Sequence, residues 1–351
     1  MVKEIVFGGH DVGMGAVDLG EHFAQPPMDT VAIAQETESQ TEIAPRHPAF
    51  DGIIGQGKLV QRIQQLANGC GATGRVLPPI LLIGPSGTGK TEVAQSVGEL
   101  MGVNVAYINC NSSLKLTALL ELLERMRPHD VAILDEVDKL RKEVQVALLS
   151  ILEGRQVSRP ARIGRRPEVE HPVNLPHVSY IGTTTRPGKM MTDLLNRFTD
   201  FQLEDYRPKE LAEIAKRVAV SEGKMLEDEA AELLSGSCFG IPRDVKKRAQ
   251  ELCLTTTNGD IDALEVKNFL SDRGIHPGGW SAAHYRLLGL IGTEGAPKAR
   301  IYNQAGIDAV LVEVYESQLI RAGLIEVQTA YGRMMTDNGL IIYGQLMRIF
   351  S

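Results

Sequence analysis

The sequence predicts an α/β fold built on a doubly wound parallel sheet, followed by an all-α region and a small C-terminal domain that ends in a hairpin. Two observations carry the prediction. Short apolar runs over Ile80–Ile83, Val131–Leu134 and Val178–Ile181 alternate with stretches of helically spaced Leu and Val. This alternation is typical of buried parallel strands joined by helices. The first run leads directly into the glycine-rich segment Gly84–Thr91, and ligands bind at the carboxyl ends of such strands.

Four regions follow from the pattern. Residues 1–45 are rich in Gly, Gln, Glu and Thr without periodicity, and we expect a mobile tail. Residues 46–205 contain the alternating strands and helices, and we expect them to form the large domain. Beyond Tyr206 the strand pattern stops, and residues 206–274 are expected to form an all-α domain with helices over Glu210–Ser221, Asp228–Ser235, Arg243–Leu254 and Asp262–Ser271.

The last region, residues 275–351, follows a Gly- and Pro-rich stretch. Its pattern predicts three helices over Ser281–Ile291, Lys298–Ala305 and Asp308–Ala322, then short strands near Ile325–Thr329 and Arg333–Thr336. Three helices and a terminal hairpin are typical of a winged-helix module.

Composition narrows the possible functions. The chain of 351 residues has 37 Lys and Arg against 44 Asp and Glu, a net charge of −7, which argues against coating nucleic acid by bulk charge. It contains no apolar run of about 18 residues, so we expect no membrane span. The four cysteines lie far apart in the sequence, which predicts neither disulfides nor a zinc site and favours a cytoplasmic location.

The strongest motif is a P-loop. Gly84, Pro85, Ser86, Gly87, Thr88, Gly89, Lys90 and Thr91 match GxxxxGK[ST] between an apolar run and a helical stretch. In such a loop, backbone N–H groups surround phosphates, the lysine reaches the β and γ oxygens, and the Thr hydroxyl ligates Mg²⁺. The alternative is an ordinary strand-to-helix turn, but the complete motif in this context favours a nucleotide site.

An acidic pair follows the second apolar run. Asp135 and Glu136 come directly after Val131–Leu134, as the acidic pair of a Walker B element does. In such an element, Asp135 would hold Mg²⁺, and Glu136 would orient or deprotonate the attacking water. A solvated acidic strand end is the alternative for this pair alone. Because it follows a P-loop, we interpret it as part of an ATP-hydrolysing site with ATP and Mg²⁺ as cofactors.

Further motifs resemble those of AAA+ ATPases, and within them those of the RuvB family of Holliday-junction branch-migration motors. The large-domain and lid motifs are Phe50–Gln56, the P-loop, Asp135–Asp138, Ile181–Arg186, Asn196–Phe198 and Gly240–Arg243. The C-terminal segments that favour this branch are Val314–Ile320, Gly323–Ile325 and Gly332–Thr336. The similarity spans about residues 46–350.

The resemblance implies specific roles. Thr184 would be sensor 1, Arg197 an arginine finger inserted into a neighbouring subunit, and Arg243 the sensor 2 arginine of the lid. Tyr206 would line the adenine pocket, with Ile53 and Ile54 near the same base. Taken singly, Arg197 is also compatible with a surface ion pair, Arg243 with a helix surface and Tyr206 with a core position. An arginine finger acting in trans implies a homo-oligomeric ring, a hexamer by resemblance.

The resemblance also implies that duplex or four-way-junction DNA is the substrate, with Arg333 as the DNA contact in the wing. The preceding helix, Asp308–Ala322, carries Asp308, Glu313 and Glu316 but only Arg321, so we expect it to be a poor reader of bases. DNA contact through the wing, without sequence preference, is therefore the prediction. A winged helix that contacts protein is the alternative.

The chain departs from the family between Glu153 and Pro176, where the family has an apolar hairpin that contacts the partner RuvA. Here the segment carries Arg155, Arg159, Arg162, Arg165 and Arg166. These arginines fit a solvated surface, a phosphate contact or an acidic partner equally well. A RuvA-like partner is accordingly an open expectation, and Gln328 stands where the family has a second wing arginine. The competing function is a protein-remodelling or clamp-loader-like AAA+ ATPase.

Overall fold

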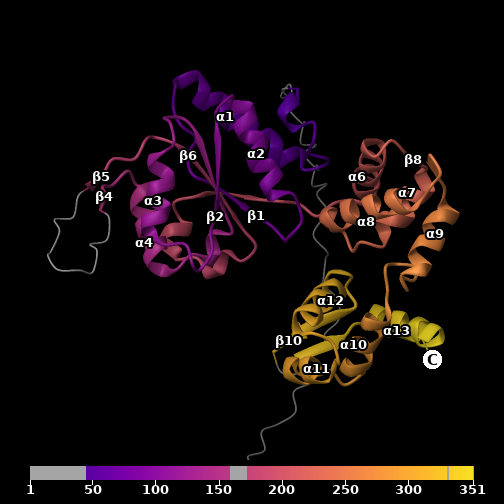
Figure 1. Ribbon diagram of the computed structural model, residues 1–351. Helices are drawn as coiled ribbons and strands as arrows, with labels where there is room; N and C mark the ends of the chain where they lie inside the picture. Colours follow the sequence, from indigo (N-terminus) through magenta and orange to yellow (C-terminus); the bar gives the residue numbers. More distant parts are fainter. Residues whose placement is uncertain (1–44, 159–171, 330–331, 351) are drawn as a thin grey trace, which may run out of the picture. The chain divides into compact units, whose positions relative to one another are not determined.

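We describe a computed structural model of the chain, which covers residues 45–158, 172–329 and 332–350 (Figure 1). Its centre is a five-stranded sheet with the strand order β2-β3-β6-β1-β7, and all neighbouring strands in it run parallel. The strands are β1 (Ile80–Ile83), β2 (Val105–Asn109), β3 (Val131–Asp135), β6 (Ser179–Thr184) and β7 (Thr199–Gln202). The doubly wound parallel sheet predicted from the sequence is confirmed.

Alternate residues of the central strands enter two different cores. Ile80 and Leu82 pack with the helices α1 (Gly57–Thr73) and α2 (Lys90–Met101). Leu81 instead packs with α3 (Leu116–Glu124) and α4 (Lys142–Leu152) on the opposite face. Figure 1 shows the two helix pairs on either side of the strands. Burial on both faces explains why the central strands are apolar throughout.

The two edge strands were not predicted. β2 lies at one edge, and three of its five side chains are exposed, so it lacks the apolar run that marks a central strand. β7 lies at the other edge, where Phe201 is its one buried residue. Short connecting elements are η1 (Pro48–Phe50), η2 (Val137–Lys139), η3 (Pro187–Lys189) and α5 (Thr192–Leu195).

The arginine-rich segment begins and ends in a small hairpin. β4 (Val157–Ser158) and β5 (Pro172–Val173) pair in antiparallel fashion. Arg155 precedes this hairpin and forms an ion pair with Glu153 at 2.9 Å. The other four arginines, Arg159, Arg162, Arg165 and Arg166, lie outside the described residues, as does the tail over residues 1–44.

The region predicted to be the lid, residues 206–274, contains the four predicted helices, which pack around one core. Proline at the first turn of α6 and an Asp262 carboxylate that accepts from the Glu265 N–H at 2.8 Å mark two of the helix starts. The one difference from an all-α region is a parallel pair of two-residue strands, β8 (Met225–Leu226) and β9 (Asp260–Ile261). The helices are α6 (Pro208–Ser221), α7 (Asp228–Gly236), α8 (Pro242–Thr255) and α9 (Ala263–Asp272).

The C-terminal domain, residues 275–350, has the three predicted helices followed by the antiparallel pair β10–β11. An additional helix, α13, follows the hairpin, and Leu346 anchors it in the domain core. The sequence pattern did not predict this last helix. The elements are α10 (Ala282–Ile291), α11 (Lys298–Gln304), α12 (Ala309–Arg321), β10 (Ile325–Gln328), β11 (Gly332–Met335) and α13 (Asp337–Phe350).

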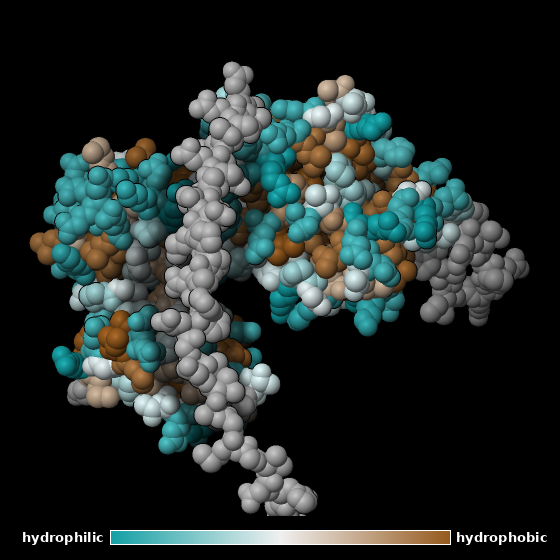
Figure 2. All heavy atoms as spheres, turned by 180° about the vertical axis from the view of Figure 1, so that it is seen from behind, coloured by the Kyte–Doolittle hydropathy of each residue, from teal (hydrophilic) through white to brown (hydrophobic). Residues whose placement is uncertain are grey.

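The acidic character expected of α12 is reduced by its folding. Asp308 caps the helix by accepting from the Val310 N–H at 2.8 Å. Glu316 is only 6% exposed, so it does not contribute to the helix surface. Val310, Leu311 and other apolar residues of α12 are exposed. The face of the molecule drawn in Figure 2 is mostly hydrophilic, with separate hydrophobic patches. Among the described residues, no helix has the length and apolarity needed to cross a bilayer.

Candidate active site

The P-loop joins β1 to the first turn of α2. Gly87 and Gly89 adopt φ values of 81° and 97°, a conformation that favours glycine. The Lys90 ammonium is 8% exposed and donates to the carbonyl oxygens of Gly84 and Pro85, both at 2.8 Å. Burial lowers the pKa of Lys90, and the Asp135 carboxylate opposes that shift. The buried ammonium group is a favourable partner for an anionic ligand such as a phosphate.

Three hydroxyl groups surround the Asp135 carboxylate at the end of β3. Thr183, on the neighbouring strand β6, donates to Oδ1 at 2.6 Å, and the Thr91 hydroxyl lies 3.4 Å from the same oxygen. Tyr107, on β2, donates to Oδ2. Burial, reinforced by this hydrogen bond, raises the pKa of Tyr107 to about 12, so its hydroxyl is protonated at neutral pH.

Glu136 follows directly and adopts a left-handed backbone conformation with φ 59°. This conformation is strained for a residue other than glycine. Its N–H donates to the Thr183 hydroxyl at 3.1 Å, and its carboxylate pairs with Lys139. The carboxylate is partly exposed at the end of the strand, next to Asp135.

Thr184, the predicted sensor 1, lies at the end of β6, and that role stays a prediction. Its hydroxyl donates to Asp138 at 2.7 Å and accepts from the Arg186 N–H at 3.0 Å, and the residue is fully buried. Because neighbouring side chains on a strand point to opposite faces, Thr183 is the one that reaches Asp135. Thr185 is partly exposed and lines a cleft together with Ser86.

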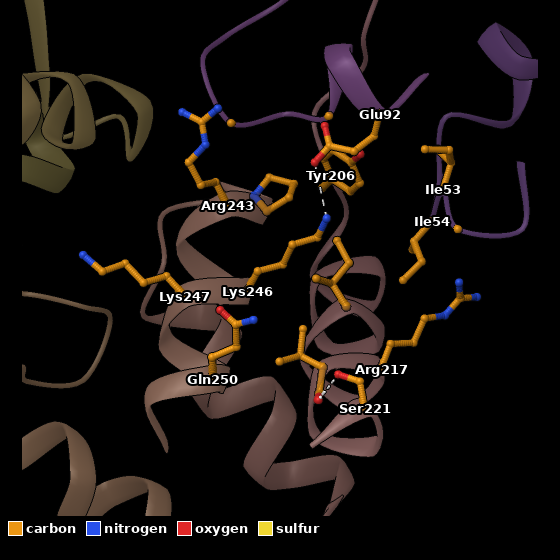
Figure 3. A pocket seen from close by; sticks show the side chains of 16 residues that line it. Ile53, Ile54, Glu92, Tyr206, Arg217, Ser221, Arg243, Lys246, Lys247 and Gln250 are labelled. Atoms are coloured by element: carbon orange, nitrogen blue, oxygen red, sulfur yellow. Dashed lines mark hydrogen bonds and ion pairs between the residues drawn. The ribbon is translucent and has the colours of Figure 1, made fainter. Parts of the chain in front are cut away.

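A cavity of about 390 Å³ adjoins the P-loop (Figure 3). Ile53, Ile54, Tyr206 and Arg243, the residues expected near the nucleotide, all line it. Their places in the chain differ widely, and the fold brings them together. The Tyr206 hydroxyl donates to the Thr88 carbonyl oxygen at 3.0 Å, and burial raises the pKa of Tyr206.

The lid contacts the phosphate loop directly. The Arg243 guanidinium donates to the Ser86 hydroxyl at 3.0 Å, and the Arg243 N–H donates to the Gly87 carbonyl oxygen at 3.2 Å. One turn along α8, Lys246 forms an ion pair with Glu92 of α2 at 3.4 Å, drawn as a dashed line in Figure 3. Residues of the P-loop and of α8 therefore line the same cavity.

The sequence did not predict the residues that hold the loop over residues 51–56 in place. Arg46 donates to the Ile53 carbonyl oxygen at 2.5 Å, and Arg217 donates to that of Asp51 at 2.6 Å. The Gln56 amide donates to Glu204 O at 2.8 Å and accepts from Glu204 N at 3.0 Å. No local motif identifies such contacts, because each joins a side chain to a backbone group.

Two predicted functional arginines have partners within the chain. Arg197, in the turn after α5, pairs with Glu153 at the end of α4, and the arginine side chain is 52% exposed. Arg333, on β11, pairs with Glu316 of α12, and these side chains are 16% and 7% exposed. Tyr302 of α11 donates to the same Glu316 carboxylate at 3.1 Å. Arg197 is therefore accessible, whereas Arg333 is largely covered.

The donor set at the P-loop fits Mg²⁺. The described residues contain no group of three or more His, Cys, Asp or Glu side chains placed to hold a metal ion. Mg²⁺ does not require one, because it commonly uses one or two protein oxygens together with phosphate oxygens and water. The Thr91 hydroxyl and the Asp135 carboxylate supply two such oxygens 3.4 Å apart.

Comparison with known proteins agrees with this architecture. Residues 45–203 match the family described as Holliday junction DNA helicase RuvB P-loop domain. The Holliday junction branch migration complex subunit RuvB of Kosmotoga olearia is 31% identical over 309 residues, 85% of this chain and 90% of that protein. The corresponding subunit of Limosilactobacillus reuteri is 31% identical over 86% of this chain and 91% of its own length.

A solved structure of the Thermotoga maritima RuvB Holliday junction branch migration motor superposes with a TM-score of 0.72 at 25% identity. It covers 86% of this chain and 98% of its own. The similarity thus extends over the large domain, the lid and the C-terminal domain and includes the P-loop. The chain belongs to the RuvB family of P-loop ATPases.

Proposed function

We propose that the protein is an ATP-driven motor that moves duplex DNA and promotes branch migration of Holliday junctions. The observation that carries the proposal is a nucleotide cavity shared by the P-loop and the lid, with Arg243 hydrogen-bonded to Ser86 of the P-loop. A ligand whose phosphates change at that contact alters how the lid and the large domain meet.

The chain's own residues suit each step of ATP hydrolysis. Lys90 and the N–H groups of the P-loop bind the phosphates. Thr91 and Asp135 would hold Mg²⁺, which would neutralise developing charge when bound. Glu136 orients the water and accepts its proton. Ile53, Ile54 and Tyr206 form the wall against which the base lies.

Completion of the site requires a second subunit. Arg197 is half exposed, and we assign it to the neighbouring subunit's site, where its charge stabilises the transferring phosphoryl group. Such an arrangement repeats head to tail and closes into a ring, for which six subunits are the family-based prediction.

The relatives are named as subunits of a branch migration complex, which supports four-way-junction DNA as the substrate and a RuvA-like protein as a partner. Residues 46–205, 206–274 and 275–351 remain the predicted large domain, lid and winged helix. The proposed motor requires both DNA and ATP, and we expect a cytoplasmic protein.

The alternative function is protein remodelling by a ring of the same kind. One observation favours it: the predicted DNA contact, Arg333, is neutralised by Glu316. The C-terminal domain would then bind a protein partner through the exposed apolar residues of α12, which include Val310 and Leu311.

The deciding experiment measures ATP hydrolysis by the full chain without DNA, with linear duplex and with a four-way junction. We expect junction DNA to raise the rate and the wild-type protein to separate the junction arms. Lys90→Ala and Glu136→Gln are the matched inactive controls. A rate that neither DNA changes would contradict the DNA motor and favour remodelling.

A further inference from the structure

The Asp135 carboxylate is engaged by hydroxyl groups on both of its oxygens. Thr183 donates to Oδ1 at 2.6 Å, and Tyr107 donates to Oδ2. The two residues come from β6 and β2, the strands on either side of β3. The carboxylate is therefore held from both neighbouring strands.

The Thr183 hydroxyl has a second role. The hydroxyl accepts a hydrogen bond from the Glu136 N–H at 3.1 Å and donates one to the Asp135 carboxylate. One side chain therefore contacts both members of the acidic pair. Glu136 needs such a partner because its backbone is left-handed, with φ 59°. Thr183 is fully buried.

These contacts leave the carboxylate able to bind a metal. Each carboxylate oxygen has two lone-pair sites, so an oxygen that accepts one hydrogen bond can also coordinate a cation. Groups that fix the orientation of a ligating side chain strengthen metal binding, because the ligand loses less freedom when the ion arrives. Tyr107 and Thr183 fix the orientation of the Asp135 carboxylate in this way.

We infer that Tyr107 and Thr183 are positioning residues that hold Asp135 in the orientation required for Mg²⁺, and that Thr183 also fixes the backbone of Glu136. The inference rests on the proposed function, since it assigns Asp135 to a nucleotide-bound metal. Tyr107 acts on the metal ligand alone, whereas Thr183 acts on the metal ligand and on the group that orients water.

The test uses Mn²⁺ as the probe, with a non-hydrolysable ATP analogue and the full chain, and measures bound Mn²⁺ by electron paramagnetic resonance. Tyr107→Phe and Thr183→Val each remove one hydroxyl at nearly constant volume. We expect each to weaken Mn²⁺ binding about tenfold, while affinity for the analogue in EDTA stays within twofold. Tyr180→Phe is the control, since it removes the hydroxyl of a buried tyrosine on β6, the strand that carries Thr183.

Two further measurements separate positioning from packing. Thr183→Ser keeps a hydroxyl and is expected to restore Mn²⁺ affinity to within about twofold of wild type. In turnover assays, Thr183→Val is expected to lower kcat more than Tyr107→Phe does, because it alone also releases Glu136. Unchanged Mn²⁺ affinity in both variants, or no rescue by serine, would overturn the inference.

Failure of the proposed function gives a different result. If the wild-type protein binds the analogue with Mn²⁺ but does not hydrolyse ATP, the motor proposal fails. The metal-binding comparison still decides the roles of Tyr107 and Thr183, because it does not depend on turnover.

Discussion

Single residues decide how the C-terminal domain can meet DNA. Arg333 lies on β11, and its guanidinium is held by Glu316 of α12, which also accepts from Tyr302. A buried pair of this kind costs desolvation, and breaking it by removal of one partner leaves an uncompensated charge. The carboxylate neutralises the arginine and therefore weakens its attraction for a phosphate.

A substitution of Glu316 tests this effect. Glu316→Gln removes the negative charge but keeps an acceptor for Arg333 and Tyr302. We expect duplex DNA to bind more tightly, because a phosphate no longer competes with a carboxylate. Arg333→Ala should weaken binding and reduce the salt dependence by about one phosphate contact. Fluorescence anisotropy over a series of salt concentrations measures both.

The double variant is the control for that experiment. If Arg333 is the contact, Glu316→Gln combined with Arg333→Ala should bind no better than Arg333→Ala alone. Tighter binding by the double variant would mean that removal of one negative charge acts through the general field and not through the arginine.

A residue at the P-loop controls the approach of the lid. Gly87 adopts φ 81°, and a Cβ placed on it would lie 2.9 Å from the Arg243 Cβ and 2.9 Å from the Ile241 Cγ2. The P-loop and the start of α8 therefore meet at a glycine because no larger residue fits between them.

We expect Gly87→Ala to weaken nucleotide binding by about tenfold or more, since the left-handed conformation alone costs about 1–2 kcal/mol for a residue with a Cβ. Titration with a fluorescent ATP analogue measures the affinity. Gly188→Ala is the matched control, because a Cβ at Gly188 meets nothing within 4 Å among the described residues. Equal affinity in the two variants would show that neither the backbone conformation of Gly87 nor its contact with the lid limits nucleotide binding.

At the scale of elements, α10 and α12 are joined through a buried histidine. The N–H of Ser281 donates to the Nδ1 of His284 at 3.1 Å, so Nε2 carries the proton and donates to Gln318 at 2.9 Å. Burial lowers the pKa of His284 to about 4, although the hydrogen bond to Gln318 acts in the opposite direction. The neutral imidazole is therefore part of the folded domain.

This histidine predicts an acid-sensitive C-terminal domain. Above pH 6.5 the imidazole is neutral in both states, and its contribution is fully present. As the pH falls from 6.5 toward 4, the unfolded chain binds a proton that the folded domain excludes, and about 1.4 kcal/mol is lost for each pH unit. At pH 5 the loss amounts to about 2 kcal/mol.

Trp280, the one tryptophan in the chain, reports on this domain because its ring lies 5.4 Å from that of His284. Urea unfolding followed by tryptophan fluorescence at pH 7 and pH 5 measures the change. His284→Gln, which does not titrate, should lose less stability between the two pH values than the wild type. An equal loss in both proteins would assign the acid sensitivity to other groups.

The elements also show what the sequence can and cannot predict. The central strands and the P-loop were predicted because burial on both faces and phosphate binding leave local patterns. The edge strand β2 was missed because most of its side chains are exposed, and with it the contact of Tyr107 with Asp135. The contact of Thr183 with Asp135 was missed as well, because the sequence does not show which face of β6 each threonine occupies.

At the scale of the whole molecule, the arginine that we assign to a neighbouring subunit's site is paired within its own chain. Lys90, Asp135 and Glu136 lie at the P-loop, whereas Arg197 pairs with Glu153 at the end of α4. An ion pair that is half exposed contributes little stability, about 0–1 kcal/mol, and can be given up for a better partner. A neighbouring subunit's phosphate site would be such a partner.

Subunit mixing tests whether the site is shared. Arg197→Ala and Glu136→Gln should each lose about 10³-fold or more of the ATPase rate. In a ring, an Arg197→Ala subunit has an intact Glu136 and can receive Arg197 from a Glu136→Gln neighbour. An equal mixture should therefore recover activity, with about a quarter of the interfaces complete in random assembly. The double variant mixed with Glu136→Gln has no complete interface and should stay inactive. If the first mixture stays as inactive as its components, Arg197 does not act between subunits, and the ring has no catalytic reason to form.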